Sequence, residues 1–329
     1  MYFVVTIDTE EDNWGDYSGP SYSLENIKKI PGIQEVFHRY EVKPTYLISY
    51  PVATDPVSIG ILGKYRDQGL CEIGSHPHPW NTPPMEEERS PFNSFINNLP
   101  SVLQYNKIKM LHDTIVKNFS VTPTSYRSGR WGFCQEVARN LIRLGYRIDT
   151  SITPYWDWTI YGGPDFSEFT NQLYKYSMRD LQGTPPRGSL LEVPATVGFI
   201  QDNFELAYSF YRRLQRFGKV GEKSIALMNK IGMLNRVCLS PETHDAPQMI
   251  LLSRKMMFRG AKVLNMYFHS PSLLENCSPF VKTSSDAKYF LARIEKVIVF
   301  AKSAGMKSVT LSQLLEEKLD IQKEIIMSD

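Results

Sequence analysis

Two histidines two residues apart are the first feature that could do chemistry. His76 and His78 lie in the segment SHPHPW, just after a short apolar run. In an extended segment, residues i and i+2 project to the same side, so both imidazoles can face one ion, and the intervening prolines stiffen the chain. The spacing fits a metal site, and it also fits a pair of surface or loop histidines without a ligand.

An acidic cluster follows the apolar run at residues 2–7. Asp8 and Glu10 are two residues apart there, with Glu11 and Asp12 beside them. One carboxylate and two imidazoles form the ligand set of a hydrolytic zinc site or a related divalent site with open positions for water. A second carboxylate would then be available to accept a proton.

Short apolar runs alternate with amphipathic stretches, and polar residues follow the apolar runs. Helices are predicted over 24–40, 57–68, 102–118, 134–144, 208–234, 286–304 and 308–323, and strands over 2–7, 43–49, 70–73 and 262–268. Repeated strand–helix units place the strand ends at one edge of a parallel sheet. The sequence therefore predicts an α/β fold, a sheet closed or nearly closed into a barrel, with the site on that rim.

Length and composition bound the class of protein. The 329 residues are 42% hydrophobic and 22% charged, which is typical of a packed globular chain. No Gly/Ser-rich linker divides the chain, so we expect a single domain over 1–329 with a helical insertion at about 200–235, whose basic segment receives no function. The formal net charge of +2 gives no general electrostatic reason to expect nucleic acid or an anionic membrane as a partner. The oligomeric state stays open.

Cysteine usage and the apolar runs indicate a compartment. The four cysteines show no C-x-x-C spacing, which argues against a zinc ribbon or a disulfide framework and favours a reducing environment. The first apolar run ends at Asp8, and no stretch approaches the roughly 20 apolar residues of a membrane span. We expect a cytoplasmic protein without a membrane span.

Five ordered segments carry a family resemblance: TIDTEED, EIGSHPHPWNTPP, SYRSGRWGF, YRIDTSITP and NMYFHSPSLLENCSPF. Together they resemble the polysaccharide deacetylase family, the NodB-like carbohydrate esterases, over nearly the whole chain. HPHPWNTPP, RSGRWGF and FHSPSL are similar to a bacterial branch associated with genes for surface polysaccharides. The resemblance implies a distorted (β/α) barrel of the polysaccharide deacetylase type, with parallel strands and outer helices, and metal-assisted removal of an acyl group from an N-acylated sugar.

The resemblance implies roles for the first two motifs. Asp8 matches the first Asp of the family's T-F-D-D and would be the catalytic base, whereas Thr9 stands where the family has a metal-binding Asp. We therefore expect the longer Glu10 side chain to supply that ligand. The family spaces its histidines four apart, H-[ST]-x-x-H, which would put the second at residue 80. His76 and His78 are the ligands we expect here.

The later motifs imply the remaining catalytic groups. Arg127 matches the Arg of the family's R-x-P motif, which orients the catalytic Asp through a charge-assisted hydrogen bond. The Pro of that motif is replaced by Gly129. His269 matches the last motif, whose His protonates the leaving amine; its alternative is a satisfied core histidine. His244 matches no family role.

Four further residues are candidates for substrate contact. Arg130 offers a donor, and Trp131 and Trp80 offer sugar-stacking surfaces, although a lone Trp is more often part of a core. Asp149 follows a predicted strand in the context DTS. It could contact the arginines or the substrate, or it could cap the end of its strand.

These residues together predict a metal-dependent carbohydrate N-deacylase. The expected cofactor is a divalent metal, zinc ahead of nickel, cobalt or manganese. The expected substrate is an acetylated or formylated amino sugar, linked to a nucleotide or a lipid as an intermediate of surface polysaccharide (lipopolysaccharide) synthesis. Two alternatives remain: a catalytically inactive carbohydrate-binding homologue, and an amidohydrolase that acts on a non-sugar amide.

Overall fold

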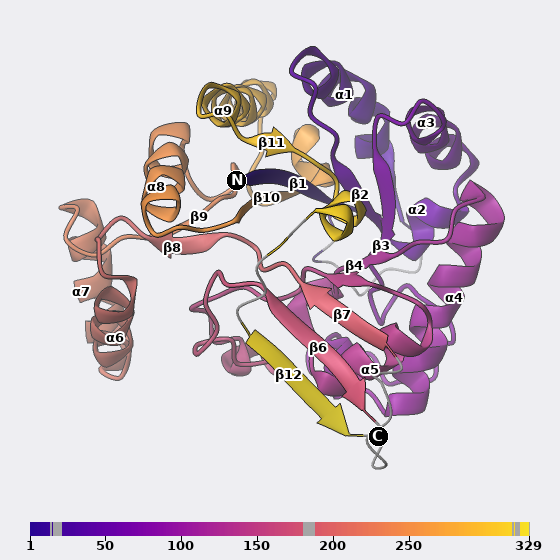
Figure 1. Cartoon of the computed structure of the whole chain (residues 1–329), viewed down its shortest axis with the longest axis horizontal. Coiled ribbons are helices and arrows are strands. Elements are labelled where there is room, and N and C mark those ends of the chain that lie inside the picture. The colour runs from indigo at the N-terminus through magenta and orange to yellow at the C-terminus, as the bar shows by residue number, and fades with distance from the viewer. Residues whose placement is uncertain (14, 16–21, 180–187, 318, 320–322, 329) are drawn as a thin grey trace.

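A mainly parallel sheet with helices on its outside forms the body of the molecule (Figure 1). The structure is a computed structural model and describes residues 1–13, 15, 22–179, 188–317, 319 and 323–328. The strands are β1 (Tyr2–Thr9), β2 (Thr45–Ile48), β3 (Glu72–Ser75), β4 (Ser125–Tyr126), β5 (Ile148–Asp149), β6 (Tyr174–Arg179), β7 (Gly188–Glu192), β8 (Val197–Phe199), β9 (Arg236–Cys238), β10 (Val263–His269), β11 (Lys307–Ser308) and β12 (Lys323–Ser328).

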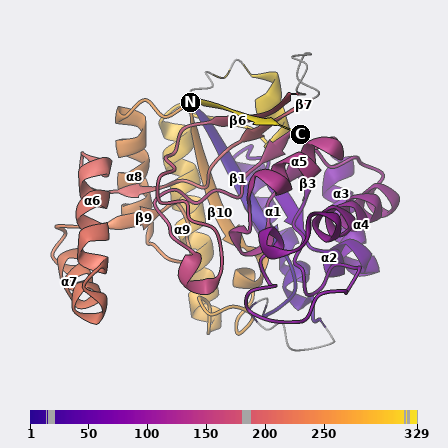
Figure 2. The same cartoon turned by 90° about the horizontal axis from the view of Figure 1, so that it is seen from below.

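The helices lie between these strands in the chain and cover the sheet from outside (Figure 2). They are α1 (Ile30–Arg39), α2 (Tyr50–Thr54), α3 (Pro56–Asp67), α4 (Ser101–Phe119), α5 (Gln135–Arg143), α6 (Phe204–Gln215), α7 (Gly218–Lys230), α8 (Ala246–Phe258) and α9 (Ser284–Ser303). Helix α1 shows how they attach: Ile30, Ile33 and Phe37 recur at helical spacing and are buried. Such apolar stripes, packed against strands that are buried on both faces, make the core.

Strand β1 is the centre of the functional half of the sheet. Its register with β10 sets Asp8 opposite His269. On the other side, β2 and β3 continue the parallel sheet, and Ser75 at the end of β3 pairs with Tyr126 of β4. Because parallel strands end at the same edge, the residues that follow β1, β3, β4 and β10 must meet on one rim.

The strand ladder leaves a gap that a loop spans. Its path is β10-β1-β2-β3-β4-β5-β7-β6-β12, with β6 and β7 antiparallel, and β8 and β9 form a separate pair. Between β5 and β10, the Val193 N–H donates to the Asp149 carbonyl and the Thr196 N–H donates to the Asn265 carbonyl. The α/β prediction with parallel strands and outer helices is confirmed, and segment 193–196 spans the gap between β5 and β10, where strand pairing stops.

The predicted elements agree with the structure in most places, and one is wrong. The predicted helix 308–323 is replaced by β11, a 3₁₀ turn at Ser312–Glu316 and the start of β12, with 318 and 320–322 outside the described residues. Leu311 and Leu314 are buried, but the turn is tied to the sheet: the Leu311 N–H donates to Thr45 Oγ1 and the Ser312 N–H donates to Glu72 Oε2. The basic stretch 208–234 contains two helices, because Gly218 adopts φ +54° between them.

Candidate active site

A pocket of about 350 Å³ lies at the rim where β1, β3, β4 and β10 end. Polar groups on its floor include Asp8, Glu10, His76, His78 and His269. Its walls are mostly aromatic, formed by Phe95, Trp131, Trp156, Trp158, Tyr161, Tyr267 and Phe280. The pocket thus combines convergent ionisable groups with flat apolar walls, the usual composition of a small-molecule site.

Glu10, His76 and His78 form a buried cluster whose ligand atoms all lie within 4.8 Å of one another. The Glu10 Oε2 atom is 2.5 Å from His78 Nε2 and 3.5 Å from His76 Nε2. Strand geometry explains the choice of residue 10: side chains alternate along β1, so Glu10 lies on the side of Asp8, while the Thr9 hydroxyl donates to the Ile7 carbonyl. The structure brings the three expected ligands together.

The donor atoms of this cluster fit a divalent metal. His76 Nδ1 is 3.0 Å from the Arg127 carbonyl oxygen, so Nδ1 carries the proton and the Nε2 lone pair faces the cluster. Glu10 Oε1 is buried and accepts no hydrogen bond from the described residues. A free imidazole lone pair and a carboxylate oxygen at one buried point are suitable ligands for zinc or a related cation.

The charges of the cluster attract positive charge. Burial raises the pKa of Glu10, but the imidazoles of His78 and His76 outweigh it and hold that pKa below its ordinary value. Burial lowers the pKa of His76, but the carboxylates of Asp8 and Glu10 raise it above the ordinary value. A proton and a metal ion therefore compete for the same electrostatic site.

Glu11 does not join the cluster. Its side chain accepts hydrogen bonds from Asn81 Nδ2 at 2.8 Å and from Ser49 Oγ at 3.2 Å, and burial raises its pKa. The Glu11 carboxylate thus holds the loop that carries His78, through its hydrogen bond with Asn81. Glu11 serves as a matched control for Glu10, because the two glutamates are adjacent in the chain and both side chains are buried.

Arg127 fixes the orientation of Asp8. Its Nη1 atom donates to Asp8 Oδ1 at 2.6 Å, and its Nη2 atom donates to Thr6 Oγ1 at 2.7 Å. Its Nε atom donates to the Thr150 carbonyl at 3.0 Å. The guanidinium is fully buried and held on several sides, so it can hold one carboxylate oxygen and leave Asp8 Oδ2 facing the pocket.

His269 is held by an acid that the sequence analysis missed. Glu242 Oε2 is 2.9 Å from His269 Nδ1, and the His269 N–H donates to Glu242 Oε1 at 3.2 Å. Its Nε2 atom lies 3.7 Å from Asp8 Oδ2 and 3.9 Å from Glu10 Oε1. Burial lowers the pKa of His269, but Glu242 and the other carboxylates raise it to about 10.

Glu242 could have been noticed because it lies in the polar segment SPETHDAP that follows β9. Two residues further on, His244 is directed elsewhere. Its Nδ1 atom accepts from the Cys238 N–H at 3.3 Å and contacts Thr243 Oγ1 at 2.9 Å. Of these two residues, only Glu242 lines the pocket.

Arg130 and Trp131 line the pocket as expected, on a strained turn. Their φ angles are +53° and +62°, in the left-handed region that non-glycine residues rarely adopt. The Arg130 guanidinium lies 4.3 Å from the Phe95 ring centroid. Trp131 packs edge-to-face on Tyr267 at 5.4 Å. The turn thus presents a cation and a large ring to the pocket.

The structure does not bring Trp80 or Asp149 to the pocket. The Trp80 ring is buried and packs on the ring of His78, with centroids 4.1 Å apart, so it supports that histidine from behind. Asp149 accepts from Ser151 Oγ at 2.7 Å and from the Ser151 N–H at 3.1 Å, and it lies beside Glu192 in the interior. Both side chains therefore pack or hydrogen-bond within the protein interior beneath the site.

Gly129 lies against His78. A Cβ atom at residue 129 would overlap Nδ1 of His78 and would lie 2.8 Å from the Pro77 carbonyl oxygen. Its own N–H donates to that oxygen at 3.1 Å. A side chain at residue 129 is therefore excluded, because the His78 ring occupies that space.

Two further tryptophans form a rigid wall. Trp156 and Trp158 stack with centroids 4.8 Å apart and planes 6° from parallel. The Arg236 guanidinium lies 3.6 Å from the centroid of Trp156, and Trp158 Nε1 donates to Thr153 Oγ1 at 2.9 Å. With its faces and its N–H engaged in this way, the pair keeps its shape without a ligand.

Comparisons with known proteins support the fold. No family model matches the sequence, and no curated protein matches it. Among solved structures, a candidate polysaccharide deacetylase from Mycobacterium smegmatis has a TM-score of 0.54 and 12% identity, covering 95% of this chain and 89% of that one. The GH57-type branching enzyme from the archaeon Pyrococcus horikoshii has a TM-score of 0.55 and 9% identity, covering 100% and 72%.

The 4-alpha-glucanotransferase from Thermococcus litoralis is also similar, with a TM-score of 0.52 and 12% identity, covering 99% of this chain and 42% of that one. At sequence identities this low, the similarity shows a shared fold and not a shared activity. Because proteins with different named activities share it, the fold does not choose among activities. The chain therefore has the α/β fold of a polysaccharide deacetylase structure, and its activity must be argued from the site.

Proposed function

We propose that the protein is a metal-dependent hydrolase that removes an acyl group from an N-acylated sugar. One observation carries the proposal: a Glu–His–His ligand cluster, an Arg-clamped aspartate and an acid-backed histidine converge in one aromatic pocket. Each group has a chemical task in amide hydrolysis, and the distances between them allow one substrate to touch all three.

Glu10, His76 and His78 would hold the cation. When bound, it supplies Lewis acidity toward the amide carbonyl and makes water more acidic. Asp8 is the proposed general base, because Arg127 restrains Oδ1 and leaves Oδ2 facing the pocket. The carboxylate has no freedom to turn away, so a proton transfer to it needs little reorganisation.

His269 is the proposed general acid. Glu242 engages Nδ1 and stabilises the protonated ring, so Nε2 carries a proton toward the pocket. Breaking an amide requires protonation of the departing nitrogen, and an imidazolium in the same pocket, 3.7 Å from Asp8 Oδ2, is placed to provide that proton. Asp8 and His269 then act in sequence on one substrate.

The proposed substrate is an acetylated or formylated amino sugar, joined to a nucleotide or a lipid. The aromatic walls suit the apolar faces of a sugar ring, and Arg130 offers a donor at the mouth. Zinc is the first metal to test, followed by nickel, cobalt and manganese. The described cysteines are all free thiols, which supports a reducing compartment, and we propose the cytoplasm. No helix among the described residues is long and apolar enough to cross a membrane.

The test combines metal analysis with a release assay. Purified protein is analysed for bound metal and then screened for acetate and formate release from N-acylated sugar nucleotides, lipid-linked sugars and non-sugar amides. Glu10→Gln should lose metal and turnover, whereas Glu11→Gln should keep the metal. Retention of stoichiometric metal by Glu10→Gln would refute the ligand assignment. Release from the non-sugar amides alone would favour an amidohydrolase that acts on a non-sugar amide. Protein that purifies without stoichiometric metal and shows no turnover would favour a catalytically inactive carbohydrate-binding homologue.

A further inference from the structure

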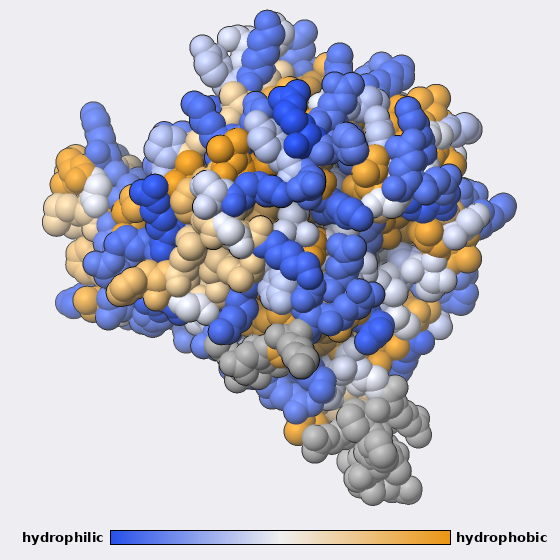
Figure 3. Space-filling view, turned by 45° about the horizontal axis from the view of Figure 1, so that its top comes forward, coloured by the Kyte–Doolittle hydropathy of each residue, from blue (hydrophilic) through white to orange (hydrophobic). Residues whose placement is uncertain are grey.

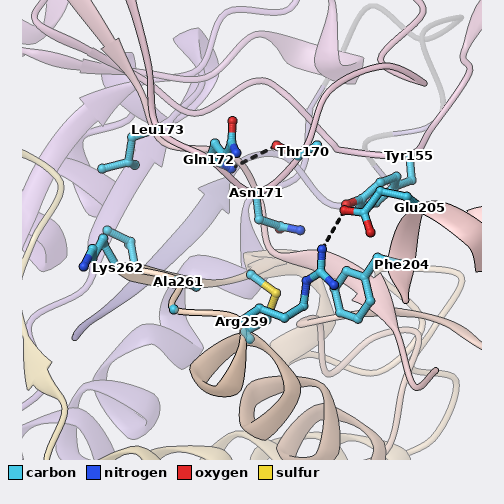
Figure 4. A pocket seen from close by; sticks show the side chains of 13 residues that line it. Tyr155, Thr170, Asn171, Gln172, Leu173, Phe204, Glu205, Arg259, Ala261 and Lys262 are labelled. Atoms are coloured by element: carbon cyan, nitrogen blue, oxygen red, sulfur yellow. Dashed lines mark hydrogen bonds and ion pairs between the residues drawn. The ribbon is translucent and has the colours of Figure 1, made fainter. Parts of the chain in front are cut away.

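Helices α6 and α7 form a lobe, residues 204–233, that stands on the outside of the barrel beside α8 (Figures 1 and 2). Its base is fixed. Arg259, the residue after α8, pairs with Glu205 at 2.6 Å, and its guanidinium lies 4.4 Å from the Phe204 ring centroid (Figure 4). The lobe therefore presents a defined outer surface.

The inner faces of the two helices explain their packing. Phe204, Ala207 and Tyr208 of α6 are buried against the core. Gly221 of α7 is buried against α6, so closely that a Cβ would overlap the Leu214 carbonyl oxygen. These buried residues form the inward-facing apolar stripe that an amphipathic helix normally has.

Each helix carries a second apolar stripe that faces away from the core. On α6 and its end these residues are Leu206, Phe210 and Phe217, exposed by 68%, 43% and 64%; on α7 and its end they are Val220, Leu227 and Ile231, exposed by 70%, 60% and 58%. Leu206 and Phe210 are four residues apart on α6, and Val220, Leu227 and Ile231 are spaced by seven and four along α7 and its C-cap, so each of these sets lies along one side of its helix. Phe217 lies in the turn between the two helices. Figure 3 shows apolar side chains beside hydrophilic ones over this lobe. A solvated helix face does not need such stripes.

Basic residues flank both stripes. The lobe contains six Lys and Arg residues and two Glu residues, a formal net charge of +4, whereas the whole chain carries +2. Lys219, Lys223 and Lys230 repeat at helical spacing on α7. Among the described residues, none of these three lysines forms an ion pair. The overall charge balance thus conceals a local positive surface.

We propose that the α6–α7 lobe docks on an anionic lipid surface. Exposed apolar stripes flanked by Lys and Arg on a helix pair are typical of elements that lie in the membrane interface, with the apolar side chains among acyl chains and the basic groups at the headgroups. The proposal does not depend on the hydrolase activity.

The charge of the lobe argues against two other occupants. A two-fold dimer would bring the same positive surface together from both copies, which is unfavourable. A nucleic acid would match the charge but would leave the apolar stripes exposed to water. An anionic bilayer satisfies both features.

Docking would place the pocket close to the membrane. Arg236 lies 3.6 Å from the ring centroid of Trp156 in the pocket wall and 4.5 Å from that of Tyr211 on α6. One side chain therefore joins the pocket wall to the base of the lobe.

The test is sedimentation of the full chain with vesicles of phosphatidylcholine containing about one-third phosphatidylglycerol, and with vesicles of phosphatidylcholine alone. We expect binding to the anionic vesicles that weakens between about 0.1 M and about 1 M salt, as the Debye length shrinks from ~10 to ~3 Å. Lys219→Gln with Lys223→Gln should lower the partition coefficient about 25-fold, at about five-fold per charge. Val220→Ser with Leu227→Ser should lower it by roughly 100-fold.

Val102→Ser is the control, because Val102 is an exposed apolar residue of α4, outside the lobe, at 72% exposure. Thermal unfolding of each variant checks that the exposed substitutions leave the fold intact. Wild-type protein that ignores anionic vesicles, equal binding to both kinds of vesicle, or double variants that bind like the wild type would each overturn the proposal. So would binding to an oligonucleotide without binding to vesicles, or a dimer in light scattering that the Val220/Leu227 substitutions dissociate.

Discussion

The contact between Gly129 and His78 gives the sharpest test of the proposed metal site, through Gly129→Ala. The φ angle of Gly129 lies outside the left-handed region, so its backbone accepts an alanine. The added Cβ would lie 2.7 Å from Cε1 of His78 and closer still to its Nδ1. A normal carbon contact is about 3.5 Å, so the ring must move by about 1 Å.

Such a movement is large for a metal ligand, whose distances hold to within about 0.2 Å. Gly129→Ala should therefore weaken metal affinity by at least about 10- to 100-fold. Affinity is measured by competition with a chelating dye. Gly60→Ala is the control, because a Cβ there meets no atom within 4 Å.

A double-mutant cycle separates this effect from general damage. Pro77 O also crowds the new methyl group, so Gly129→Ala should lower the melting temperature whether or not His78 is present. The loss of metal affinity should shrink sharply in the His78→Ala background, because the displaced ligand is already missing. Unchanged affinity in Gly129→Ala, or the same loss in both backgrounds, would refute the reasoning.

Three other substitutions test separate groups. Asp8→Asn should retain metal and lose turnover, because an amide cannot accept the proton; loss of metal would make Asp8 a ligand. His269→Ala should slow poor amine leaving groups by on the order of 10² to 10⁴ and spare activated ones, and equal slowing of both would remove it as the acid. Burial raises the pKa of Glu192 well above its ordinary value, so the folded chain holds a proton that the unfolded chain has released, and stability falls as pH rises above the ordinary carboxyl pKa. Glu192→Gln should flatten that decline in urea unfolding between about pH 5 and pH 8, and an unchanged slope would contradict the shift.

Local patterns were sufficient to predict the parallel half of the fold. The runs that became β1, β2 and β10 are short, apolar and followed by polar residues, and the stretches that became α3, α4 and α5 have helical spacing and clear ends. The antiparallel pair β6–β7 and strand β12 were missed. Their pairing is decided by partners far along the chain: Tyr176 of β6 pairs with Leu190 on one side and Ile325 on the other.

The positions of candidate site residues could be predicted where a residue with a reactive side chain lies at the end of a predicted strand. Asp8, His76, Arg127 and His269 all meet that condition, and parallel register brings them together. Glu242 lies in a loop, and its hydrogen bond to His269 crosses 27 residues of sequence. The polar segment SPETHDAP marks a candidate loop, but nothing in the local sequence identifies Glu242 as the partner of His269. Trp80 has the residue type of a sugar platform, but only the packing shows that its face is used by His78.

The positions at which this chain differs from the deacetylase motifs it resembles are linked through one side chain, that of His78. With the second histidine at residue 78, its ring takes the volume beside Cα of residue 129, which excludes the proline found in the family's motif. Trp80, at the position the family reserves for that histidine, packs behind the ring at 4.1 Å and its Nε1 lies 3.4 Å from Glu11. On the acid side, strand alternation turns Thr9 away and brings Glu10 to His78 at 2.5 Å. Glu10, His78, Trp80 and Gly129 thus complement one another in space, and this mutual fit supports the proposed metal site around His78.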